Sequence, residues 1–200
     1  MGQETSDLLL GAVGLALFLL LVGAGGFALA ACNRRRYDRA LAHLRPLIEG
    51  AARSDGNSGL LAGTFQGREV YVAVSPGTTT YRGFERNGEG QKNVFEIELR
   101  GVPGGRDWKV GYGRAWGVGR AEWRAEAGDD ALADRLRRAG VVELLSGMGN
   151  WPLVEYRAGR GALVYSEDIH PHLAPTGERF RQQLELLVAL ADINEQSNPA

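Results

Sequence analysis

The chain has 200 residues, a formal net charge of −1 at pH 7 and a single cysteine. This length suits one ordinary domain with its own hydrophobic core. The near-neutral charge argues against nucleic acid as the main partner, because phosphate binding needs a concentrated basic surface. The lone cysteine, Cys32, excludes an internal disulfide and agrees with a reducing compartment.

The first feature along the chain is an apolar run from Leu8 to Cys32. Its 25 residues include no charged residue and no His, Asn or Gln. About 20 apolar residues suffice to cross a hydrocarbon core of about 30 Å as a helix. The run therefore predicts a transmembrane helix over residues 8–32, a short outer tail at 1–7, and the lipid bilayer as a partner.

Basic residues follow this run and none precedes it. Lys and Arg resist translocation, so the charges that flank a span set its orientation. The N-terminus is expected outside the cell membrane and the large domain on its cytoplasmic side. The orientation-setting residues are Arg34, Arg35, Arg36 and Arg39.

Other interpretations of this N-terminus are open. Leu29-Ala30-Ala31-Cys32 looks like the lipobox of bacterial lipoproteins, which would make the chain an exported lipoprotein lipidated at Cys32. The arginines that follow oppose export. A cleaved signal peptide is disfavoured, because the apolar run is long and no basic region precedes it. Met1-Gly2 with Ser6 matches the myristoylation pattern, which serves no purpose ahead of a translocated N-terminus.

Beyond the span, a basic juxtamembrane segment is expected to lead into a linker helix from Tyr37 to Ala52. Apolar residues recur there every three or four positions, and Pro46 is expected to kink the helix. The polar, glycine-containing stretch 54–59 predicts the start of the compact domain. The predicted divisions are an outer tail at 1–7, a span at 8–32, a linker at 33–53, a domain at 54–194 and a disordered tail at 195–200.

Alternation of apolar and polar residues predicts a mainly antiparallel sheet. A hairpin is expected around Gln66-Gly67-Arg68. The apolar residues of the strands are expected on one face, and the charged residues on a solvated second face, where they form cross-strand pairs. Strands are predicted at 60–65, 69–74, 95–100, 108–112, 121–126, 153–157 and 162–166.

Segment 75–93 is polar and glycine-rich, which predicts a mobile loop. Its Tyr81 and Phe84 are expected to fold back onto the domain, with a binding role as the alternative. Trp108 and Trp123 lie in predicted strands and are expected to fill the core.

Three helices are expected after the fifth strand. Asp129 or Asp130 caps a helix through Arg138, and a short helical segment follows at 141–148. Thr176 caps a closing helix through about Ile193. The element order predicts an α+β domain of about seven strands, covered on one face by helices.

One cluster has the residue types of a metal site. His170 and His172, with Glu167 and Asp168 just before them, suit zinc, but such sites need three or four ligands in fixed geometry. The third histidine, His43, lies in the linker helix. A polar connection between a strand and a helix explains the cluster more simply, so no metal is expected, and Asp168, His170 and His172 are the candidates if one binds.

The sequence contains no complete catalytic or cofactor motif among the common patterns. The glycine pairs at 111/113 and 117/119 do not complete G-x-G-x-x-G, and no nucleophile elbow, Walker loop, zinc-protease motif or paired cysteines occur. The sequence therefore predicts neither a cofactor nor an enzyme activity, with an enzyme of undetected type as a remaining alternative.

These observations predict a single-pass membrane protein that presents a small cytoplasmic interaction domain without catalysis. An exported lipoprotein with a ligand-binding domain is the alternative. The partner is an unidentified membrane or cytoplasmic protein, or a second copy of the chain. A homodimer contact is considered because Leu186 and Leu190 widen the apolar surface of the closing helix, although burial within the domain is favoured.

Overall fold

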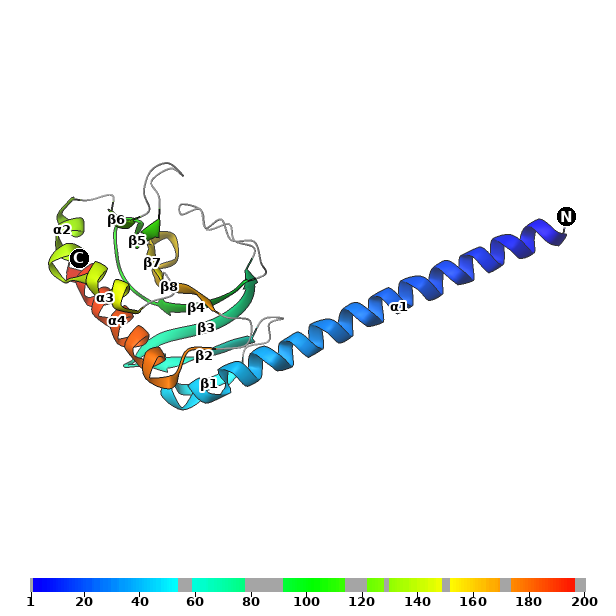
Figure 1. The fold of residues 1–200 in the computed structure, drawn as a ribbon, viewed down its shortest axis with the longest axis horizontal. Coiled ribbons are helices and arrows are strands. Elements are labelled where there is room, and N and C mark those ends of the chain that lie inside the picture. Colours follow the sequence, from blue (N-terminus) through cyan, green and yellow to red (C-terminus); the bar gives the residue numbers. More distant parts are fainter. Residues whose placement is uncertain are drawn as a thin grey trace.

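The computed structural model describes residues 2–53, 59–77, 92–113, 122–127, 130–148, 152–169 and 174–196. In the first helix it describes the side chains of 14–28, 31–32 and 35–41. The described residues form an α+β domain from which one long helix projects (Figure 1). The α+β class predicted from the sequence is confirmed.

The helices and strands alternate unevenly along the chain. The strands are β1 (Glu49–Arg53), β2 (Gly59–Phe65), β3 (Arg68–Gly77), β4 (Lys92–Arg100), β5 (Trp108–Gly113), β6 (Glu122–Ala127), β7 (Leu153–Arg157) and β8 (Ala162–Ile169). The α-helices are α1 (Gly2–Leu41), α2 (Asp130–Arg138), α3 (Val141–Met148) and α4 (Gly177–Gln196). Two short 3-10 helices are η1 (Ala42–Leu47) and η3 (Ala158–Arg160).

The eight described strands form one sheet in the order β1-β2-β3-β4-β8-β7-β5-β6, and every neighbouring pair is antiparallel. The prediction of about seven strands misses β1, at the edge of the sheet. Helices α2, α3 and α4 lie along one side of the sheet (Figure 1).

The hairpin between β2 and β3 forms where the sequence predicts it. Gln66 and Gly67 both have positive φ, 50° and 77°, as the central residues of a type I′ turn do. This turn matches the twist of antiparallel strands, and Phe65 pairs with Arg68 across it.

The core lies between the sheet and α4. Phe95 of β4 meets Phe180 of α4 edge to face, with ring centroids 6.1 Å apart. Trp108 is buried, as predicted, and donates a hydrogen bond from Nε1 to Asn194 Oδ1 at 2.9 Å. Trp123 is half-buried against the same core.

Helix α4 is apolar over much of its circumference because the domain surrounds it. Leu186 and Leu190 are only 7% and 1% exposed. Both side chains are mostly buried within the domain itself, the arrangement favoured from the sequence, and the homodimer contact stays a prediction. The helix begins after Thr176, as predicted, and continues to Gln196, beyond its expected end.

The predicted linker helix is wrong in its second half. The α-helix ends at Leu41, and η1, which contains Pro46, leads into β1. Proline lacks the donor that a longer α-helix would need. Residues Tyr37 to Ile48 of the predicted linker also supply four side chains to the core: Tyr37, Leu41, Leu44 and Ile48.

The second face of the sheet is less open than predicted. Ala162, Val164 and Ser166 of β8 point to that face and are buried, as is Glu98 of β4. The second face is therefore buried along β8 and at Glu98, and half-buried at Ala73 of β3 and Glu96 of β4. The loop predicted at 75–93 begins and ends in strand residues, and its Tyr81 and Phe84 lie outside the described residues.

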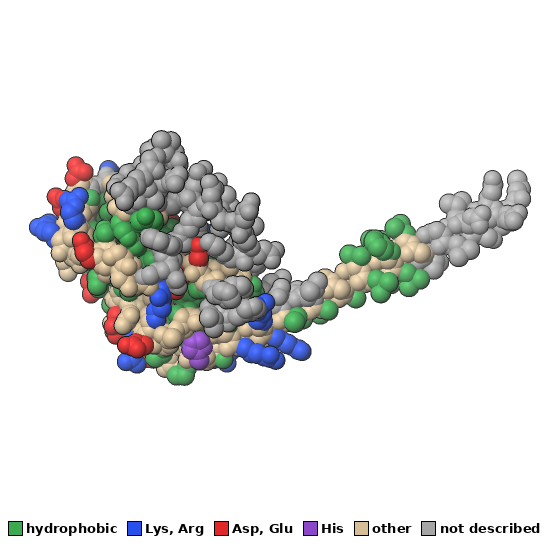
Figure 2. Space-filling model, in the orientation of Figure 1, with side chains coloured by type: hydrophobic (Ala, Val, Ile, Leu, Met, Phe, Trp, Pro, Cys, Tyr) green, Lys and Arg blue, Asp and Glu red, His purple; other side chains and the backbone are tan. Residues whose placement is uncertain are grey.

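Within the described part of the chain, no helix meets the length and apolarity of a membrane span. The span predicted over 8–32 has described side chains from 14 to 28 and at 31–32, and it stays a prediction. Figure 2 shows apolar side chains on the part of α1 that projects from the domain.

Candidate functional site

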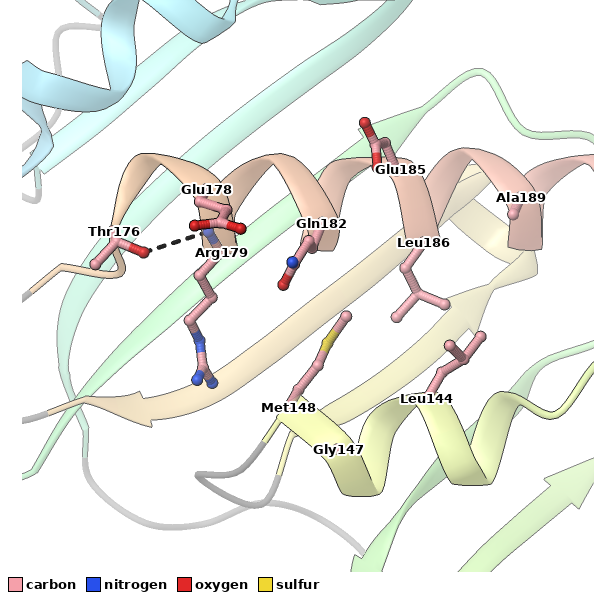
Figure 3. A pocket seen from close by; sticks show the side chains of 10 residues that line it. All are labelled: Leu144, Gly147, Met148, Thr176, Glu178, Arg179, Gln182, Glu185, Leu186 and Ala189. Atoms are coloured by element: carbon pink, nitrogen blue, oxygen red, sulfur yellow. Dashed lines mark hydrogen bonds between the residues drawn. The ribbon is translucent and has the colours of Figure 1, made fainter.

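A cleft of about 640 Å³ lies between α3 and α4. Sites of about 300 to 1,000 Å³ are typical for ligands of drug size. Figure 3 shows the cleft with apolar side chains of both helices directed toward one another. From α3 it is lined by Leu144, Gly147 and Met148, and from the α4 region by Thr176, Glu178, Arg179, Gln182, Glu185, Leu186 and Ala189.

The α3 side of the cleft follows from helix periodicity. Val141 and Leu145 are four residues apart and bury one face of α3. Leu144 and Met148 are also four residues apart, on the face that borders the cleft. Leu144 is 53% exposed, whereas Met148 packs against the core.

The α4 side of the cleft begins at the helix cap. The backbone N–H of Arg179 donates to Thr176 Oγ1 at 3.3 Å, which satisfies one of the free donors of the first turn. Glu178 and Glu185 are exposed and border the cleft from α4, two turns apart. Leu186 reaches inward toward Met148 (Figure 3).

An ion pair borders one end of the cleft. Arg179 Nη2 of α4 donates to Glu167 Oε2 of β8, and the Glu167 side chain is only 1% exposed. Tyr165 donates its hydroxyl proton to the same oxygen at 3.0 Å. Gln183 donates from Nε2 to Glu167 Oε1 at 3.0 Å, and the same nitrogen lies 3.1 Å from the Tyr165 hydroxyl. This network joins the sheet to α4.

The sequence explains why these groups meet. Tyr165 and Glu167 are two residues apart in β8 and therefore share the face that α4 covers. Arg179 and Gln183 are four residues apart in α4 and share the helix face that meets it. The network leaves two buried atoms without a hydrogen-bond partner among the described residues, Arg179 Nε and Gln183 Oε1.

The pKa values of Tyr165 and Arg179 in this network are both raised. Burial, together with the charge of Glu167, raises the pKa of Tyr165. Burial works to lower the pKa of Arg179, but its hydrogen bond to Glu167 and the charge of that residue outweigh burial and raise it. Tyr165 therefore stays protonated and Arg179 stays charged near neutral pH.

A second cavity, of about 430 Å³, lies over β5, β6 and β7. Its charges are already paired. Lys109 Nζ lies 2.9 Å from Glu126 Oε2, its cross-strand partner in the β5–β6 register, and Arg157 donates to Glu155 two residues away on the same strand. This cavity offers fewer apolar groups to a ligand than the cleft between α3 and α4.

The metal candidates are only partly described. Asp168 lies near the end of β8 and is half-buried, whereas His170 and His172 lie outside the described residues. Where side chains are described, no group of three His, Cys, Asp or Glu could hold a metal. The third histidine, His43, donates from Nε2 to Pro175 O at 2.8 Å and so joins η1 to the start of α4.

The residues predicted to set membrane orientation lie on the last turns of α1. Arg35, Arg36 and Arg39 are exposed, as is Cys32. The side chains of Arg34 and of Leu8, the predicted outer end of the span, lie outside the described residues.

Sequence reasoning missed Arg179 and Gln183 as partners of Glu167. A signal was present, because Glu167 occupies an inward position in the alternation Leu163, Tyr165, Glu167. A carboxylate at an inward strand position needs a cationic or hydrogen-bonding partner.

Comparison of the chain with protein-family models, with curated proteins and with solved structures gives no match.

Proposed function

We propose that this chain is a single-pass membrane protein that presents its α+β domain at the cytoplasmic face and acts by binding a partner, without catalysis. The observation that carries the proposal is the continuity of α1. One helix joins an exposed apolar segment to the core of the domain.

The exposed segment is apolar on all sides, which supports the proposed span. Every residue from Gly14 to Ala28 is exposed to solvent in the isolated chain. At about 100° per residue, its large apolar side chains point to all sides of the helix. A helix that is apolar all round is stable when a core or a membrane surrounds it. These side chains are Leu15, Leu17, Phe18, Leu19, Leu20, Leu21, Val22 and Phe27.

The junction supports a short, fixed distance between the bilayer and the domain. Tyr37 and Leu41 are four residues apart on α1 and are buried in the domain core. The Tyr37 hydroxyl donates to Asn93 Oδ1 of β4 at 3.2 Å. From Cys32 to Tyr37 the helix rises by about 7 to 8 Å, so the domain would begin close to the headgroups.

The continuous helix also favours the anchor over the lipoprotein alternative. Lipidation at Cys32 would remove everything before it, including the exposed apolar segment. The exposed arginines on the following turns suit the cytoplasmic side of a membrane and oppose export. A binding role is supported by the cleft between α3 and α4, which is mostly apolar and is bordered by Arg179, a cation already paired with Glu167.

A reporter experiment tests the topology. A reporter active only in the cytoplasm, fused after Ala200, is expected to be active, and a periplasmic reporter at the same position is expected to be silent. Replacing Arg34, Arg35 and Arg36 with glutamate is expected to weaken this preference. Periplasmic activity of the unaltered chain, with labelled lipid incorporated at Cys32 and lost in Cys32→Ser, would establish the lipoprotein instead.

A further inference from the structure

We propose that the cleft between α3 and α4 is a docking groove for a basic amphipathic helix of a partner protein. The proposal rests on the binding role proposed above and names the chemistry of the partner. Apolar side chains on the two helices and unpaired acidic side chains on the rim of α4 define what fits there.

The apolar part of the groove is exposed where a partner would reach it. Among the described side chains outside α1, Leu144 is the large hydrophobic residue that is mostly exposed. It borders the same cavity as Met148, Leu186 and Ala189. In Figure 3 the side chains of Leu144 and Met148 point toward Leu186 across the groove. Exposed apolar groups that line a concavity mark interaction sites more often than scattered ones do.

The two walls of the groove are helices, which favours a helix as its occupant. A third helix can lay an apolar stripe, with side chains at i, i+3, i+4 and i+7, into a groove between two others. Residues that face the cavity on α4 run from Glu178 to Ala189. This stretch rises by about 16 Å, enough to contact about three turns of a bound helix.

The charge of the rim selects a basic partner. Glu178 and Glu185 are exposed, lie on one side of α4 about 10 Å apart along the axis, and have no ion pair among the described residues. Arg179, the cation that lines the cleft, is already paired with Glu167. Arg181 of α4 is exposed but does not line the cleft. Lys or Arg residues about two turns apart, beside the apolar stripe, complement this rim.

The groove is formed before a partner arrives. Its α4 wall is fixed to the sheet by the ion pair and by the hydrogen bonds of Tyr165 and Gln183 to Glu167. Binding to a preformed groove avoids part of the ordering cost of association.

The test uses the full chain in nanodiscs of phosphatidylcholine, which carries no net charge. The probe is a fluorescein-labelled helical peptide with leucines at i, i+3, i+4 and i+7 and lysines on both flanks. A second peptide has the same leucines and glutamates in place of the lysines. Fluorescence anisotropy is measured against protein concentration, and the signal of empty nanodiscs is subtracted.

The lysine peptide is expected to bind saturably and the glutamate peptide at least about tenfold more weakly. Leu144→Glu and Glu185→Lys are each expected to weaken binding of the lysine peptide at least about tenfold. The matched control is Glu143→Lys, because Glu143 is an exposed acid on α3 outside the cleft. It is expected to change the affinity less than about twofold. Glu178→Lys repeats the charge test at a second exposed position.

Several results would overturn the proposal. One is a lysine peptide that shows no binding above the signal of empty nanodiscs. Another is equal binding of the lysine and glutamate peptides. A third is unaltered affinity for the lysine peptide in both Glu185→Lys and Glu178→Lys. A dimer in mass photometry that Leu144→Glu abolishes would assign the groove to a second copy of the chain. These outcomes are separable from failure of the proposed function, because they leave membrane extraction and reporter topology unchanged.

Discussion

At the residue scale, the buried carboxylate of Glu167 depends on Arg179. An ion pair of this kind adds little net stability, but removing one partner leaves a buried charge uncompensated. Sequence reasoning identified Glu167 only as a polar neighbour of the histidine cluster. Its partners come from α4, and no local pattern in either segment specifies which of the residues on that helix will face β8.

Arg179→Met is expected to lower the free energy of unfolding by about 3 kcal/mol, because Glu167 then stays buried without its cation. The double variant Glu167→Gln/Arg179→Met is expected to recover most of this loss. Arg137→Met removes an exposed ion pair with Asp134, and it is expected to change the free energy of unfolding by less than about 1 kcal/mol. Denaturant unfolding followed by tryptophan fluorescence measures all three, and equal losses at Arg179 and Arg137 would contradict the role of the buried pair.

Glu96 of β4 gives a pH-dependent prediction. Burial raises the pKa of its carboxyl above the ordinary value of 4.5, and the nearby charges of Glu98 and Glu155 add to the rise. A raised pKa in the folded state favours folding at acidic pH, and this contribution is lost as the pH rises through the folded-state pKa.

Glu96→Gln cannot ionise, so it is expected to increase the free energy of unfolding at pH 7, by less than about 1 kcal/mol. The gain is expected to shrink as the pH is lowered toward 4. Unfolding midpoints of both chains between pH 4 and 8 check this. A gain that is constant with pH, or a loss at pH 7, would show that ionisation of Glu96 is not the cause. Glu69→Gln, at an exposed position of β3, is the control.

At the element scale, the sequence predicted what local signals encode. The hairpin at Gln66-Gly67, the short helix at 141–148 and the cap at Thr176 each have turn or capping residues next to periodic apolar positions. Strand β1 has no such signal, because Glu49–Arg53 contains glycine and alanines that favour no strand. β1 forms because it can pair with the edge of β2. Gly63 of β2 allows the backbone of β1 to come close, since a Cβ at Gly63 would lie 2.5 Å from Glu49 O.

The junction of α1 and β1 leads to a prediction about fragments. Removing residues 1–53 would remove an edge strand and four core side chains, including Leu44 and Ile48. The fragment 34–200 is therefore expected to unfold cooperatively, whereas 54–200 is expected to be molten or aggregated, since burial of each such side chain contributes about 1.5 to 3 kcal/mol. Circular dichroism and thermal melting compare the two, and a cooperative melt of 54–200 at the same temperature would contradict the role of the junction.

At the scale of the whole molecule, the sequence predicted an α+β domain but not the cleft. Leu144 and Met148 of α3 are more than 35 positions before Leu186 of α4, and only the packing of α3 beside α4 brings the three side chains to one cavity. The apolar run before Cys32, by contrast, is a contiguous signal that needs no tertiary context. The proposed function combines both, because α1 joins the run directly to the core.

Alkaline carbonate extraction of cell membranes tests this proposed connection between span and domain most directly. We expect the full chain to stay in the membrane pellet after extraction, because an apolar helix that crosses the bilayer is not released by high pH. The fragment 34–200, which lacks the exposed apolar residues of α1 but keeps the core side chain Leu41, is expected in the supernatant as a folded protein. Release of the full chain by carbonate would contradict the membrane anchor.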